Sequence, residues 1–186
     1  MNMPNKLLLA ALMFTGASVA NAGDYVLGNT NGGDGTVSGT DTNFTLTGAN
    51  NADVANGVGF ESMTTFSALA IGSKAYTFSW AYKSKGYDSN GPATAFWDPA
   101  GYLVNDKFIQ LTQSSDITAS GFKTVTLKAG DKFGWYVDSI DSAYGAGVLS
   151  VEVTDVADIA AVPEPGTWTM LLTGLGLLGL MRRRKA

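Results

Sequence analysis

Apolar and polar side chains alternate with a period of two through much of the chain, and this pattern constrains the fold more than any other feature. Such alternation puts the apolar residues on one face of a β-strand. It occurs in five segments rich in aromatic and β-branched residues, namely 44–47, 76–82, 124–127, 133–137 and 149–153. No segment longer than ten residues has helical periodicity. We therefore expect an all-β chain.

Turn-forming residues separate these segments. Ala129-Gly130-Asp131 predicts a hairpin between strands 122–128 and 132–138. Several short strands at this spacing are typical of a sandwich or barrel. We expect an antiparallel β-sandwich that is jelly-roll-like, and an immunoglobulin-like sandwich is the second choice.

Residues 29–41 are rich in Gly, Asn and Asp and lack apolar periodicity. One interpretation is a flexible loop that joins a first strand at Tyr25–Leu27 to the rest of the domain. The other is a calcium loop, since alternating Asp and Asn oxygens suit that ion. The spacing does not match an EF-hand.

The N-terminal residues have the pattern of an export signal. Lys6 is followed by an apolar run from Leu7 to Phe14, and Ala20-Asn21-Ala22 has the small-x-small form of a cleavage site. We expect residues 1–22 to be a signal peptide. Signal peptidase would recognise Ala20 and Ala22 and remove this segment. The mature chain would then begin at Gly23.

The C-terminal residues combine three unlike elements. Pro163, Glu164 and Pro165 keep the backbone extended, because proline lacks an N–H and fixes φ. An apolar stretch from Trp168 to Met181 follows, which as a helix is short for a bilayer core of about 30 Å. The basic cluster Arg182, Arg183, Arg184 and Lys185 then favours the cytoplasmic side and acts as a transmembrane stop.

This order of elements resembles the PEP-CTERM sorting signal of Gram-negative bacteria that make extracellular polysaccharide. The resemblance covers residues 162–185 and implies an exosortase as partner, a membrane-embedded enzyme that would cut near the Pro-Glu-Pro motif. It implies a transient inner-membrane intermediate and then a place at the cell surface or in the extracellular matrix. Which bond is cut stays open.

Residues 23–161 are then one domain of ordinary size. Segments 78–82, 98–105 and 129–134, with the acidic turn that follows, resemble a β-sandwich ectodomain found in many PEP-CTERM proteins. That second resemblance implies a fold and supplies no catalytic residues.

The charge and composition of residues 23–161 exclude several functions. Seven lysines stand against fifteen acidic residues, a net charge of −8, and arginine is absent. This balance argues against nucleic acid and anionic lipid as partners. The chain has no Cys and no His, which excludes a cysteine nucleophile, a Ser-His-Asp triad and the usual zinc sites.

Two carboxylates are candidate metal ligands. Asp138 and Asp141 lie three residues apart after a predicted strand and can face one point, where hard oxygens suit calcium. The alternative is that they are solvated turn residues that accept hydrogen bonds from their own backbone. No other cofactor is expected.

Aromatic residues are the other candidate site. Flat rings bind the apolar face of a sugar, while neighbouring Asp and Asn accept hydrogen bonds from hydroxyls. Trp97, Asp98 and Tyr102 form the predicted ligand-binding set, and the alternative for Trp97 is a place in the core. Alternation places Trp80 and Trp135 in the core. The wider set of aromatic candidates is Tyr82, Tyr87, Phe96, Trp97, Tyr102, Tyr136 and Tyr144.

We expect an exported, non-enzymatic protein that is a structural or polysaccharide-binding component of a biofilm matrix. One alternative is an adhesion or self-assembling module that acts through exposed strand edges. The other is a glycan-active enzyme, which would need two carboxylates with different pKa values.

Overall fold

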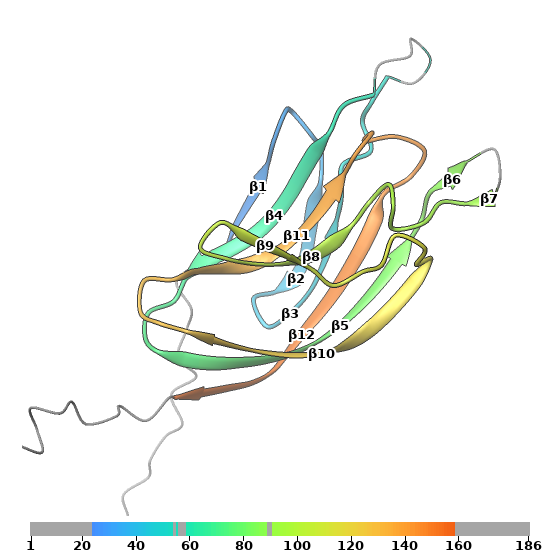
Figure 1. The fold of residues 1–186 in the computed structure, drawn as a ribbon. Helices are drawn as coiled ribbons and strands as arrows, with labels where there is room; N and C mark the ends of the chain where they lie inside the picture. Colours follow the sequence, from blue (N-terminus) through green and yellow to red (C-terminus); the bar gives the residue numbers. More distant parts are fainter. Residues whose placement is uncertain (1–23, 54, 56–58, 89–90, 159–186) are drawn as a thin grey trace, which may run out of the picture.

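The computed structural model describes residues 24–53, 55, 59–88 and 91–158, which form two five-stranded antiparallel sheets packed face to face (Figure 1). Sheet A has the strand order β1 (Val26–Asn29), β4 (Ser62–Leu69), β11 (Lys132–Ser139), β8 (Ala100–Val104) and β9 (Lys107–Gln110). Sheet B has the order β10 (Thr118–Leu127), β5 (Lys74–Ser84), β12 (Gly147–Asp158), β3 (Asn43–Thr47) and β2 (Thr36–Thr40). A short ribbon of β6 (Tyr87–Asp88) and β7 (Gly91–Pro92) follows β5.

The connections between the sheets define a jelly roll. Strands β3, β12, β5 and β10 lie side by side in sheet B and face β4, β11, β8 and β9 of sheet A. This is the strand order of two interlocked Greek keys. The strands β1 and β2 extend the two sheets by one strand each. The all-β prediction and its first-choice topology are therefore confirmed.

The sequence alternation explains which face of each strand is buried. In β4 the buried residues Ser62, Thr64, Phe66 and Ala68 alternate with partly exposed ones. In β5 the buried Tyr76, Phe78 and Tyr82 follow the same period. Since neighbouring side chains point to opposite faces of a strand, one face of each sheet supplies the core.

Aromatic rings from both sheets meet at the centre of the core. Trp135 of β11 is fully buried. Its ring centroid lies 5.0 Å from that of Phe44, 5.5 Å from Phe78 and 4.7 Å from Phe133. The first two rings belong to sheet B and pack against the indole edge-to-face, a favourable geometry for ring quadrupoles. Trp135 therefore joins the two layers.

The predicted hairpin between residues 122–128 and 132–138 is wrong. Strand β10 pairs with β5 in sheet B, with Val125 opposite Tyr76, whereas β11 lies in sheet A between β4 and β8. The turn Ala129-Gly130-Asp131 carries the chain across the sandwich instead. Leu127 and Phe133 on its two sides are both buried in the core between the layers, so crossing keeps both side chains out of water.

The interpretation of residues 29–41 as a loop is also wrong in part. Residues Thr36–Thr40 form β2, which pairs with β3 along its whole length. The polar side chains before it bind backbone groups: Asn29 donates to the carbonyl of Gly35 at 2.8 Å, and Asp34 accepts from the N–H of Asn50 at 2.7 Å. These side chains fix the entry to an edge strand.

Several sequence predictions lie outside the described residues. They are the signal peptide with Ala20 and Ala22, the Pro163-Glu164-Pro165 motif, the apolar segment and the basic cluster 182–185. Within the ranges that the structure describes, no helix is long and apolar enough to cross a membrane.

Replacing the central tryptophan tests its role in joining the sheets. We expect Trp135→Ala to lower the free energy of unfolding by about 3–5 kcal/mol, because it leaves a large cavity between the layers. Trp135→Phe should cost less, since part of the ring packing is kept. The control is Phe122→Ala on β10, whose side chain is 77% exposed, with an expected change of about 0.5 kcal/mol or less. Urea unfolding of the full chain in mild detergent measures all three, and equal losses for Trp135→Ala and Phe122→Ala would contradict this account.

Candidate functional site

A small pocket opens at one end of the sandwich, between the segment that joins β5 to β8 and the loop that joins β11 to β12. Its volume is about 130 Å³. The first segment contributes Tyr87, Ala93, Trp97 and Asp98, and the second contributes Asp141, Ala143, Tyr144 and Gly145. We call these eight residues the end pocket.

Backbone hydrogen bonds hold the two walls of the end pocket together. The N–H of Tyr87 donates to the carbonyl of Tyr144 at 2.9 Å, and the N–H of Ile140 donates to the carbonyl of Trp97 at 2.8 Å. A further bond of 3.1 Å runs from the N–H of Lys85 to the carbonyl of Ala146. The pocket therefore rests on continuous main-chain pairing, although its walls are distant in sequence.

The tip of the second wall requires an unusual backbone. Tyr144 has φ 57° and Gly145 has φ 108°. A Cβ on Gly145 would lie 2.6 Å from the carbonyl oxygen of Lys85, so only glycine fits there. This turn lets the chain pass close to the first wall and leaves the Tyr144 side chain at the surface.

Three aromatic rings surround the end pocket and remain accessible. The exposed fractions are 68% for Tyr87, 37% for Trp97 and 63% for Tyr144. The Phe96 ring packs edge-to-face against the Trp97 ring, with centroids 5.0 Å apart and an interplanar angle of 87°. This contact and the backbone bonds of Trp97 orient its indole. The two alanines contribute small, buried methyl groups to the lining.

Asp98 is a buried carboxyl in the wall of the end pocket, with only 2% of its surface exposed. Burial raises the pKa of Asp98 to about 6, and the negative charges of Asp141 and Asp138 add to the effect. The nearby Ser139 hydroxyl and the backbone of Gly147 lower this pKa but offset only part of the rise. Near neutral pH, Asp98 is thus a proton-exchanging group in a negative environment.

Asp141 is the second carboxylate of the end pocket. Its Oδ1 accepts a hydrogen bond from the N–H of Ala143 at 3.1 Å, an Asx-type contact with its own turn. Such a bond fixes the orientation of the side chain.

Asp138 does not line the end pocket. It lies on β11, where its backbone N–H donates to the carbonyl of Pro99 at 2.9 Å. Burial raises its pKa to about 6, and the charge of Glu61 contributes. In the part of the chain that the structure describes, no group of three acidic side chains could hold a metal ion. The hydrogen bond from Ala143 supports the turn interpretation of Asp141, and calcium binding by Asp138 and Asp141 stays a prediction.

The structure therefore divides the sequence-predicted site. It brings Trp97, Asp98 and Asp141 together, and it adds Tyr87 and Tyr144 from the wider aromatic set. Tyr102 is different: it is 7% exposed and packs in the core, 5.9 Å from the Phe78 ring. Its ring is thus inaccessible to a ligand. Tyr82 and Tyr136 are buried as well.

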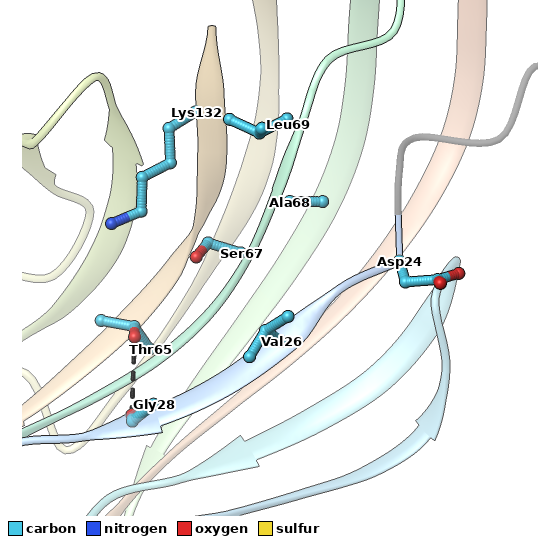
Figure 2. A pocket seen from close by; sticks show the side chains of 8 residues that line it. All are labelled: Asp24, Val26, Gly28, Thr65, Ser67, Ala68, Leu69 and Lys132. Atoms are coloured by element: carbon cyan, nitrogen blue, oxygen red, sulfur yellow. Dashed lines mark hydrogen bonds between the residues drawn. The ribbon is translucent and has the colours of Figure 1, made fainter. Parts of the chain in front are cut away.

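A larger hollow of about 550 Å³ lies along β1 and β4 at the opposite end of sheet A (Figure 2). Figure 2 shows Val26, Leu69 and the Lys132 stem around it, and the Thr65 hydroxyl directed at the carbonyl of Gly28, a bond of 3.5 Å. No aromatic ring lines this groove. It therefore lacks the flat rings on which a sugar packs, and the end pocket is the better candidate site for a glycan.

The raised pKa of Asp98 predicts a specific pH dependence of stability. A carboxyl whose pKa rises from 3.8 to about 6 on folding stabilises the fold below the lower value and loses this contribution as pH rises through the higher one. We expect the free energy of unfolding to fall between these two pH values, and Asp98→Asn to remove on the order of 2 kcal/mol of that fall. The raised pKa of Asp138 should cause a further fall in the free energy of unfolding over the same pH range. Asp106→Asn, in the turn between β8 and β9, is the control, and urea unfolding at several pH values measures the slope. An unchanged slope in Asp98→Asn would refute the assignment.

Comparison with known proteins gives one sequence match and several distant structural ones. No curated protein matches the sequence. A family 35 carbohydrate binding module from Clostridium thermocellum is 11% identical, covering 68% of this chain and 90% of that one, with a TM-score of 0.34. Another module of that family, from an environmental isolate, is 21% identical over 74% and 99% of the two chains, with a TM-score of 0.34.

The chain also matches a β-glucosidase from Kluyveromyces marxianus at 17% identity and a TM-score of 0.29. The match covers 51% of this chain but only 10% of that enzyme. The model of the PEP-CTERM protein-sorting motif matches residues 161–185. The chain therefore carries a PEP-CTERM sorting motif, which implies an exported protein that an exosortase processes through a C-terminally membrane-anchored intermediate.

Proposed function

We propose that this exported protein is a polysaccharide-binding component of the extracellular matrix of a Gram-negative bacterium, and that it binds glycan through the end pocket without cutting it. The observation that carries the proposal is the meeting of three accessible aromatic rings with two carboxylates at one end of the sandwich.

The chemistry of the end pocket suits a sugar. A pyranose has an apolar face that packs on an aromatic ring and hydroxyls that donate hydrogen bonds at its edge. Trp97, Tyr87 and Tyr144 offer such rings, and the carboxylate of Asp141 offers an acceptor beside them. Aromatic side chains also bury much surface with few torsions to fix, which limits the entropy cost of binding.

The size of the end pocket limits what it holds. At about 130 Å³ it is smaller than the roughly 300–1,000 Å³ typical of pockets for drug-sized ligands. It suits one sugar residue, with the rest of a glycan chain lying outside over the exposed Tyr87 and Tyr144. Single-residue sites are individually weak, and a matrix with many copies of protein and glycan compensates through multivalency.

The position of the end pocket fits a protein that is sorted by its C-terminus. Strand β12 starts at Gly147 beside the pocket, and its last residue, Asp158, pairs with Lys74 at the other end of the sandwich. Twelve strand residues span roughly 35–40 Å. The sorting motif begins three residues later, at 161, and the start of β1 lies at that same far end (Figure 1). The pocket thus faces away from the membrane while the tail is attached.

Binding without cleavage is favoured by how the two carboxylates are engaged. Glycoside hydrolysis needs an acid and a base that both reach the scissile bond. Asp98 has the raised pKa of an acid but is 2% exposed and lies in the pocket wall. Asp141 already accepts a bond from Ala143. An assay for new reducing ends checks this part of the proposal, and their release would replace binding by catalysis.

Removing either of two pocket rings should weaken retention on polysaccharide. We expect Trp97→Ala and Tyr144→Ala each to weaken binding to the producing organism's own polysaccharide by about tenfold, since a stacked ring contributes about 1 kcal/mol or more. Phe122→Ala removes a ring outside the pocket that is more exposed than either of these, and it should bind as the wild type does. The measurement is a pull-down of the full chain, with calcium and with EDTA.

The same experiment can reject the proposal. The proposal is wrong if the wild-type protein is retained neither with calcium nor with EDTA. It is also wrong if Phe122→Ala lowers the affinity as much as Trp97→Ala and Tyr144→Ala do. Retention only with calcium would support the prediction that Asp138 and Asp141 are metal ligands.

A further inference from the structure

The end pocket has a strong charge asymmetry. Among its eight lining residues two are carboxylates and none carries a positive charge. Asp138, just behind the wall, adds a third negative group that acts on Asp98. The ion pair between Lys132 and Asp106, 3.3 Å apart, lies at the opposite end of the sandwich. No lysine of the lining compensates these charges.

The rings of the end pocket share this electrostatic character. The face of a Trp or Tyr ring carries the negative part of the ring quadrupole and attracts cations, most strongly where water is excluded. Three such rings border one small cavity together with Asp98 and Asp141. A neutral sugar would use the ring surface but would leave the carboxylate charges uncompensated. An ammonium group would satisfy both.

The geometry points to a cationic amino sugar, a glycan residue with a free protonated amino group, as the preferred occupant of the end pocket. The inference rests on the proposed function and names its substrate class. The ammonium group lies near Asp141 and the ring faces, while the pyranose packs on Trp97. An anionic sugar is disfavoured, since its carboxylate would face two like charges.

The buried carboxyl supports this assignment. Burial and two neighbouring negative charges keep part of the Asp98 population protonated near pH 6. A cation in the pocket would favour the ionised form and lower its pKa. The groups that face Asp98 are Asp141 and Asp138 as charges, with the Ser139 hydroxyl and the Gly147 backbone beside it. The Tyr82 phenol is also near, because the charge of Asp98 helps to raise the pKa of Tyr82.

Three matched hexasaccharides test the inference. β-1,4-linked hexamers of glucosamine, N-acetylglucosamine and glucose differ only in the group at C2. We titrate each into the full chain in mild detergent with EDTA, at about pH 6, where the amino groups are protonated. The expected result is that the glucosamine hexamer binds at least about tenfold tighter than the other two, since cation–π contacts and one near charge pair both favour the ammonium group.

Two variants separate the pocket from general attraction to an acidic protein. Asp141→Asn keeps an oxygen for the Ala143 N–H but removes the charge, so it should lose the preference for glucosamine and keep the glucose affinity. Trp97→Ala leaves every charge in place but removes the ring on which the pyranose packs, so it should weaken the binding of all three hexamers. Asp106→Asn removes an exposed charge at the far end and should leave all three affinities unchanged.

The outcomes separate the inference from the proposed function. Equal affinity for the three hexamers, a preference that survives Asp141→Asn, or a glucosamine affinity that Trp97→Ala leaves unchanged overturns the inference. So does an equal loss of all three affinities in Asp141→Asn, because Asp141 would then act only as a hydrogen-bond acceptor. If none of the hexamers binds, the inference is overturned as well, and retention on the native polysaccharide still decides the proposed function.

Discussion

The edge-to-face packing of Trp135 against Phe44 and Phe78 joins the two layers, and the end pocket depends on it. Trp135 belongs to β11, whose C-terminal end continues into the loop with Asp141 and Tyr144, while Phe78 belongs to β5, whose end leads to Tyr87. The two pocket walls are therefore extensions of strands in opposite sheets. The distance between the sheets, set by the rings in the core, also sets the separation of these walls.

The alternation of residues was enough to predict strands but not their partners. The segments around Phe44, Phe78, Trp135 and Val151 lie in strands with these residues in the core. The pairing of Val125 with Tyr76 joins residues far apart in sequence. The turn at Gly130 looks the same whether it closes a hairpin or crosses the sandwich, because both connections need a tight turn and inward apolar neighbours. Strand pairing is non-local information that the local pattern does not contain.

The candidate site shows the same limit. Trp97 and Asp98 are adjacent, so sequence proximity was sufficient to associate them. Tyr102 lies in the run Ala100–Val104, where both faces of the strand are largely buried, and no alternation distinguishes an inward from an outward ring there. The contribution of Tyr144 depends on the positive φ of Tyr144 and Gly145 and on a bond to the backbone of Tyr87, which only the folded structure brings together.

The carboxyl groups near the end pocket destabilise the fold that they belong to. Burial raises the pKa values of both Asp98 and Asp138, and each feels a further acidic neighbour, so their ionisation near neutral pH costs free energy. A core built only for stability would replace such groups by apolar ones, because unpaired buried charges are among the largest single penalties in proteins. Carboxyl groups with perturbed pKa values are concentrated at functional sites. A ligand that neutralises the pocket would return part of that free energy as affinity, which links the free-energy cost of these two carboxyl groups to what the end pocket binds.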